Sequence, residues 1–167
     1  FAGLDGLWTF STEPVDAVDG VQNVVMPHTM PLIGVVHVEV FNGYLYVAGR
    51  YADGKLRHSY IDYNMMGSQL IDDSNCPHSA SFIKKAGKIF AIKDDVVRFS
   101  ATGNARDWSD EKDAGFLPVA LQQSVNNKPV ALGEYQNNLV VFFEDSAQIW
   151  QVDTDPKLHR LIDTVPI

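Results

Sequence analysis

The residues of this chain that could do chemistry are few and lie far apart. Cys76-Pro77-His78 places a thiol two positions from an imidazole, the two groups that a cysteine nucleophile and its base would supply. Neighbouring loop residues seldom reach the geometry of a catalytic pair, so we interpret Cys76 as a structural thiol. It is also the only cysteine, which excludes an intrachain disulfide.

Metal-ligating residue types occur, but not at the spacing of a metal site. Asp72-Asp73 and Asp153-Thr154-Asp155 carry the carboxylates that a hard cation such as calcium prefers. The second group lacks the glycine and glutamate of a calcium loop, and Asp155-Pro156 is typical of a strand end and a turn. The histidines form no pair with ligand spacing; they are His28, His37, His58, His78 and His159. We interpret His28 as a loop histidine, and we predict no catalytic residue, no metal site and no cofactor.

Composition narrows the functional classes. The 167 residues suffice for one domain, 46% of them are hydrophobic, and the net charge is −8. An acidic balance argues against a dedicated nucleic-acid-binding surface, yet it is compatible with a wall past which DNA slides, since like charge prevents sticking. No apolar run approaches the roughly 20 residues of a membrane-spanning helix. The sequence also contains no glycine-rich phosphate loop and no Gly-x-Ser-x-Gly motif.

The clearest structural signal lies between residues 130 and 155. Residues 139–143 (LVVFF) form the short apolar run of a fully buried strand, and residues 147–152 are typical of a return strand. Glu144-Asp145-Ser146 separates the two with turn residues. An earlier turn is predicted at 136–138, because asparagine tolerates positive φ.

Two copies of this pattern occur upstream. Residues 35–41 alternate as a half-buried strand does, and strands at 44–47 and 56–61 follow across the turns of Asn42-Gly43 and Asp53-Gly54. The second copy has strands at 81–83, 89–92 and 96–100. The aligned turn residues Gly43, Gly87 and Asn137 lie 44 and 50 residues apart.

A period of about 40–50 residues with three or four strands per unit is typical of propeller blades. We therefore predict an all-β fold of antiparallel meander repeats, blade-like and part of a β-propeller. The prediction is a single β domain or propeller fragment over 1–167, with repeats at about 35–61, 80–102 and 130–153 and an inserted loop at 103–127. Three blades cannot close a propeller, so we expect the chain to be a segment of a longer polypeptide.

The inserted loop has the most individual sequence. Its first part is similar to the Asp-box of sialidase propellers, but Thr102 and Asn104 stand where that motif needs aspartate and glycine. We predict instead that Trp108 is a buried packing residue and that Arg106 and Asp107 fix the loop. Trp8 and Trp150 are expected to be further packing anchors. Ser109 is expected to be the N-cap of one helical turn.

The C-terminal part of the chain resembles a phage structural protein. The resemblance rests on Arg106-Asp107-Trp108, Asp113-Ala114-Gly115-Phe116, residues 139–143 and residues 148–153, and it covers roughly the last 70 residues. In their order these segments are similar to the nozzle (tail tubular, or hub) protein of short-tailed, podovirus-type phages. The resemblance implies a propeller-containing, non-enzymatic virion subunit, six copies of which form a ring that extends the channel for DNA ejection.

Partners follow from the same resemblance. It implies a homo-oligomeric ring in the phage tail that contacts the portal and adaptor and the tail fibre or spike proteins, with DNA passing through the lumen without specific binding. One alternative is a β-propeller glycan-binding or hydrolytic domain with a site at the mouth of the central channel. Loss of glycan binding on substitution of Trp108 or Trp150 would support it. Another is a propeller interaction module outside phages.

Overall fold

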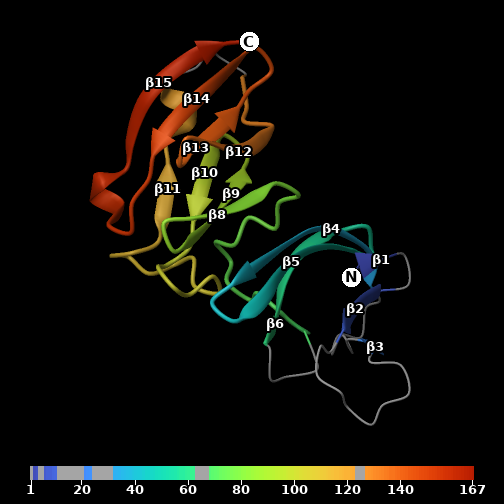
Figure 1. Ribbon diagram of the computed structural model, residues 1–167. Helices are drawn as coiled ribbons and strands as arrows, with labels where there is room; N and C mark the ends of the chain where they lie inside the picture. Colours follow the sequence, from blue (N-terminus) through green and yellow to red (C-terminus); the bar gives the residue numbers. More distant parts are fainter. Residues whose placement is uncertain (1, 4–5, 11–20, 24–31, 63–67, 123–126) are drawn as a thin grey trace. The chain divides into compact units, whose positions relative to one another are not determined.

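The computed structural model describes residues 2–3, 6–10, 21–23, 32–62, 68–122 and 127–167 (Figure 1). The chain divides into two compact units, Phe1–Ile71 and Asp72–Ile167. Strands and two short 3-10 helices make up the regular structure of the described residues, and every strand pairing is antiparallel. The predicted all-β fold of antiparallel meanders is therefore confirmed.

The first unit contains a three-stranded and a four-stranded sheet, each with its strands in chain order. The small sheet consists of β1 (Ala2–Gly3), β2 (Gly6–Phe10) and β3 (Val21–Asn23). The larger sheet consists of β4 (Leu32–Phe41), β5 (Tyr44–Tyr51), β6 (Leu56–Asp62) and β7 (Ser68–Leu70). Val47 and Ile61 are buried against Val35, Val38 and Leu45. The buried face expected from the alternation of residues 35–41 is wrong, because Val36 and Val40 are 47% and 60% exposed and the register of β4 shifts between Val35 and His37.

The second unit contains two four-stranded meanders joined by a longer connection. The first consists of β8 (Phe82–Lys85), β9 (Lys88–Lys93), β10 (Val96–Phe99) and β11 (Gly115–Leu117). The second consists of β12 (Ala131–Tyr135), β13 (Asn138–Phe142), β14 (Ser146–Gln151) and β15 (Arg160–Pro166). The 3-10 helices η1 (Val119–Gln122) and η2 (Pro156–Leu158) lie in the connections.

All three four-stranded sheets begin with the same tight turn. Its two central residues have positive φ in each sheet: 45° and 82° at Asn42-Gly43, 47° and 70° at Ala86-Gly87, and 46° and 66° at Gln136-Asn137. A two-residue turn with positive φ at both positions matches the twist of the flanking strands. The three turns that align in the sequence therefore also share one backbone conformation.

The two sheets of the second unit pack face to face over one hydrophobic core. The core residues are Phe90, Val97, Phe99, Leu117, Val119, Leu139, Val141, Phe143 and Trp150. Polar contacts join the first strands of the two sheets. The Lys85 ammonium lies 3.0 Å from the Glu134 carboxylate, and the Leu132 amide donates to Ser81 Oγ at 2.9 Å.

Two features of these sheets differ from the sequence expectation. Strand β11 lies within the segment 103–127 that we described as an inserted loop, and β15 adds an outer strand beyond the third repeat. The run 139–143 is buried as predicted except at one position. Phe142, the last residue of β13, is 36% exposed, whereas the other four residues are at most 6% exposed.

Candidate functional site

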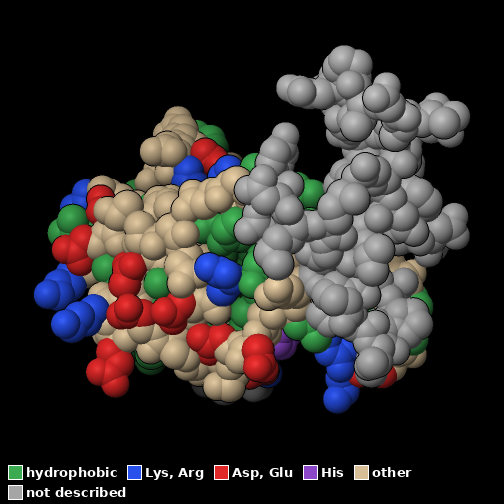
Figure 2. All heavy atoms as spheres, turned by 90° about the horizontal axis from the view of Figure 1, so that it is seen from below, with side chains coloured by type: hydrophobic (Ala, Val, Ile, Leu, Met, Phe, Trp, Pro, Cys, Tyr) green, Lys and Arg blue, Asp and Glu red, His purple; other side chains and the backbone are tan. Residues whose placement is uncertain are grey.

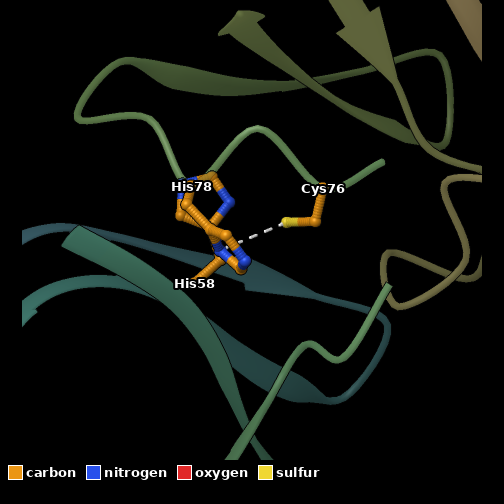
Figure 3. A group of neighbouring side chains, drawn as sticks. All are labelled: His58, Cys76 and His78. Atoms are coloured by element: carbon orange, nitrogen blue, oxygen red, sulfur yellow. Dashed lines mark hydrogen bonds between the residues drawn. The ribbon is translucent and has the colours of Figure 1, made fainter. Parts of the chain in front are cut away.

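Cys76 and His78 meet in space, although their nearness in the chain made this geometry unexpected. The Cys76 thiol is hydrogen-bonded to the His78 imidazole, with Cys76 Sγ 3.7 Å from His78 Nδ1 (Figure 3). The turn at His78, where φ is 51°, brings the two side chains together. The thiol is 3% exposed, whereas reactive cysteines lie in partly exposed positions. The pair is thus suited to packing the loop between β7 and β8 rather than to attacking a substrate.

The Asp73 carboxylate organises a second loop. It accepts hydrogen bonds from the Asn75 amide at 2.8 Å, the Trp108 amide at 2.7 Å and the Ser109 hydroxyl at 2.8 Å. Desolvation raises the pKa of the Asp73 carboxyl, but these hydrogen bonds outweigh it, so the pKa lies below its ordinary value. The carboxylate oxygens that a cation would need are therefore engaged by loop donors.

The loop held by Asp73 buries Trp108, as predicted. Trp108 is 1% exposed and its indole N–H donates to the Ala105 carbonyl at 3.0 Å. Asp107 fixes the loop as expected, since its carboxylate accepts from the amides of Ser109 and Asp110 at 3.0 Å each. The expected N-cap at Ser109 is wrong. Asp110 accepts from the amides of Lys112 and Asp113 instead, in a hydrogen-bonded turn that does not become a helix.

A polar cluster of the second unit is centred on Asp113. Its carboxylate forms an ion pair with Lys88, whose side chain is completely buried. It also accepts from the Thr102 amide at 2.6 Å and the Thr102 hydroxyl at 2.8 Å. Desolvation raises the pKa of the Asp113 carboxyl, but the bonds from Lys88 and Thr102 outweigh it and hold the pKa below its ordinary value. We call Lys88, Thr102 and Asp113 the Asp113 clamp.

The clamp connects to the second sheet of this unit through two residues. The Thr102 hydroxyl lies 3.3 Å from the Thr154 carbonyl. His159 lies with its ring perpendicular to that of Phe99, at a centroid distance of 4.8 Å, and its Nδ1 accepts from the Asp153 amide at 3.1 Å. Burial lowers the pKa of His159 and the Lys88 charge lowers it further, against the opposing effect of Asp153 and Asp155. His159 is therefore suited to a neutral, structural role.

The remaining residues that the sequence singled out are also structural where the structure describes them. Asp155 caps η2, since its carboxylate accepts from the Lys157 amide at 3.0 Å, and Asp153 accepts from the Asp155 amide at 3.1 Å. His58 is buried and hydrogen-bonded through Nδ1 to the Tyr46 hydroxyl at 2.8 Å. His28 and the Trp8 side chain lie outside the described residues.

Trp150 is 6% exposed and its indole N–H donates to Gln148 Oε1 at 2.8 Å. Trp108 and Trp150 are thus packing anchors, as predicted, and neither turns a ring face to solvent for a glycan. His37 Nε2 lies 3.7 Å from a Glu39 carboxylate oxygen, and Asp72 is exposed. Within the described parts of the chain, no helix is long and apolar enough to cross a membrane.

Sequence reasoning did not find the Asp113 clamp. Lys88 follows a turn and Asp113 lies in a polar loop, so each looks like an ordinary surface charge. Their pairing depends on the return of residues 100–114 to the start of β9, where Lys88 lies. Comparison of the chain with models of protein families, with curated proteins and with solved structures found no match.

Proposed function

We propose that this protein is a virion structural protein, a subunit of the tail nozzle of a short-tailed phage, and that it acts by shape and assembly. The observation that carries the proposal is the set of three four-stranded antiparallel meanders that share one turn geometry, two of them packed face to face. This arrangement supports the interpretation of the two packed sheets as adjacent blades of a β-propeller. The resemblance of the C-terminal segments to nozzle proteins supports the phage assignment.

The residues behind that resemblance have structural roles here. Trp108 fills the interior and Asp113 ties two turns together, as described above. Gly115 pairs with Phe99, and a Cβ at this position would lie 2.9 Å from the Phe99 ring. A side chain is therefore excluded where the family-like sequence has glycine. A pattern that specifies loop shape rather than a reactive group favours a structural protein over an enzyme.

The charge of the chain suits a conduit. A net charge of −8 repels DNA phosphates, and a channel that bound DNA would slow its passage. In the view of Figure 2, acidic and basic side chains are interspersed over the described surface and form no broad basic field. In the proposed ring of six copies, DNA passes through the lumen without specific binding. The portal and adaptor and the tail fibre or spike proteins are the expected partners.

Negative-stain imaging of the protein, alone and mixed with the portal–adaptor complex encoded in the same genome, tests this function. A hollow ring or tube that docks coaxially under the portal is the expected result. A monomeric closed disc that does not bind the portal would contradict the proposal and favour a ligand-binding propeller. A basic inner wall in the assembled ring would contradict only the claim that the lumen repels DNA.

A further inference from the structure

The imidazole of His159 has one nitrogen that is hydrogen-bonded and one that is not. His159 ends the connection between β14 and β15, directly after η2. Its Nδ1 accepts from the Asp153 amide at 3.1 Å, so the proton of the neutral ring is on Nε2. Nε2 is buried and has no hydrogen-bond partner among the described residues. The ring therefore fits this position in one protonation state only, and even then one of its donors is unsatisfied.

The neutral ring lies against aromatic side chains of the neighbouring sheet. It is perpendicular to the Phe99 ring at a centroid distance of 4.8 Å, and its centroid is 5.8 Å from that of Phe90. Val152, at the other end of the same connection, packs partly buried against the core that contains both phenylalanines. The imidazole thus holds residues 152–159 on the sheet of β8–β11.

Positive charge lies on the buried side of the ring and negative charge on its exposed side. The Lys88 side chain is completely buried, and its ammonium lies 5.5 Å from the centroid of the Phe99 ring. Asp153 is partly exposed and Asp155 is exposed. Hydrogen bonds from the Asp155 amide and the Thr154 hydroxyl hold the pKa of the Asp153 carboxyl below its ordinary value, so this group stays ionised where a histidine titrates.

The other charged groups of the elements around the ring are paired, exposed or directed elsewhere. Asp113 pairs with Lys88. Arg98 points to the face of β10 opposite Phe99, because neighbouring strand residues alternate. Lys157 and Arg160, which flank the ring in the chain, are exposed. Lys88, Asp153 and Asp155 are therefore the charges that decide where a charged ring would lie.

Protonation is incompatible with the observed position of the ring. In the charged form both nitrogens carry a proton, so Nδ1 would meet the Asp153 amide donor to donor. Burial and then the Lys88 charge lower the pKa of His159, whereas Asp153 and Asp155 raise it. Desolvation, Lys88 and the lost hydrogen bond all favour displacement of the charged ring toward the two carboxylates.

We propose that the connection of residues 152–159 opens when His159 takes up a proton. The neutral ring lies on Phe99, and the protonated ring leaves it and pairs with the carboxylates of Asp153 and Asp155. The sheet stays folded, because the pairing of β14 with β15 does not involve the imidazole. One protonation thus moves a packed connection between two arrangements, and Phe99 becomes accessible to solvent. The proposal concerns the second unit alone and does not depend on the proposed function.

Nuclear magnetic resonance of the wild type, titrated from pH 7.5 to 4.5, tests the opening without any substitution. The His159 ring protons, shifted at pH 7.5 by the neighbouring Phe99 ring, are expected to reach the values of a free histidine with a midpoint below pH 6.5. Exchange of the Asp153 amide, corrected for pH, should accelerate at least about tenfold in the same step, while amides of β9 and β13 keep their protection. A ring that keeps its shift while it titrates, or loss of protection throughout β9 and β13 in that step, would overturn the proposal.

Two variants test the charges. Asp153→Asn removes the attracting charge but can still accept from the Asp155 amide, so the midpoint should fall by about 0.5 pH unit. Asp94→Asn is the matched control, because Asp94 is exposed in the turn at the other end of β9 from Lys88, and it should leave the midpoint unchanged. His159→Gln should abolish the step at the Asp153 amide. Equal midpoints in Asp153→Asn and the wild type, or a step that persists in His159→Gln, would refute the opening.

Discussion

Lys88 and Asp113, 25 residues apart in the chain, form an ion pair in which the lysine side chain has no solvent exposure. A buried charge that loses its partner is strongly destabilising. We expect Asp113→Ala to lower the free energy of unfolding by about 3 kcal/mol, measured by urea denaturation with tryptophan fluorescence. Glu111→Ala removes the same charge from an exposed position of the same turn and should change stability by less than about 0.5 kcal/mol.

A second substitution separates the lost charge pair from lost packing. Because Lys88→Met removes the buried charge but keeps the aliphatic stem, adding it to Asp113→Ala should restore part of the lost stability. A double variant that is weaker than Asp113→Ala would show that the desolvated ammonium is not the source of the loss.

Substitutions at two adjacent positions of the turn between β8 and β9 are expected to change stability in opposite directions. Gly87 has φ of 70°, and a Cβ there would lie 3.3 Å from Thr102 Cγ2, so Gly87→Ala should destabilise by about 1–2 kcal/mol. Ala86 is an alanine at φ of 47°, and Ala86→Gly should stabilise by up to about 0.5 kcal/mol, since relief of strain exceeds the entropic cost of glycine. Thermal unfolding of both variants checks the pair, and a stabilising Gly87→Ala would contradict the turn geometry.

Acid is expected to weaken the second unit through His159. Its pKa is lowered in the folded state by burial first and by the Lys88 charge second. As the pH falls below 6.5, His159 takes up a proton in the unfolded chain but stays neutral to a lower pH in the folded chain. The contribution of His159 to the free energy of unfolding is therefore fully present above this pH and is lost progressively below it.

His159→Gln provides the comparison, because glutamine can still accept from the Asp153 amide but does not titrate. Urea denaturation at pH 7.5 and 5.5 should give a larger loss of unfolding free energy for the wild type than for this variant. Equal losses in the two proteins would remove His159 from the acid response.

The loop of residues 103–114 should depend on its tryptophan far more than on its arginine. Trp108 is 1% exposed, and Trp108→Ala is expected to cost about 3–5 kcal/mol of stability. Arg106 is exposed and bonds within the loop to Asn104 Oδ1, so Arg106→Ala should change stability by less than about 0.5 kcal/mol. Differential scanning calorimetry distinguishes the two, and a neutral Trp108→Ala would mean that the loop does not anchor the unit.

The fold class was accessible from sequence because its signals are local. Asn42-Gly43 acts within one hairpin, and the structure forms this turn. The alternation of residues 35–41 predicted a strand but not its buried face, since Val36 and Val40 are exposed. Strand β11 was not accessible, since three residues are too few to show a period of two. The exposure of Phe142 was also hidden, because an apolar run does not reveal which of its residues have a partner on the second face.

The polar contacts of the interior could not be predicted from the sequence, because they join segments that are distant in the chain. Asp73 reaches Trp108 35 residues later, and nothing in the Asp72-Asp73 dipeptide distinguishes a loop-organising carboxylate from a cation ligand. Cys76 and His78 were recognised as neighbours, but burial of the thiol is a property of the assembled loop.

The chain-order arrangement of the four-stranded sheets has a consequence for how the protein forms. Each strand pairs with the one synthesised just before it, and no pairing inside these sheets waits for a distant segment. Low contact order of this kind favours rapid folding, so each meander can assemble as it leaves the ribosome. The two completed sheets, β8–β11 and β12–β15, then pack face to face. Until they do, the apolar face of the sheet synthesised last stays exposed to solvent.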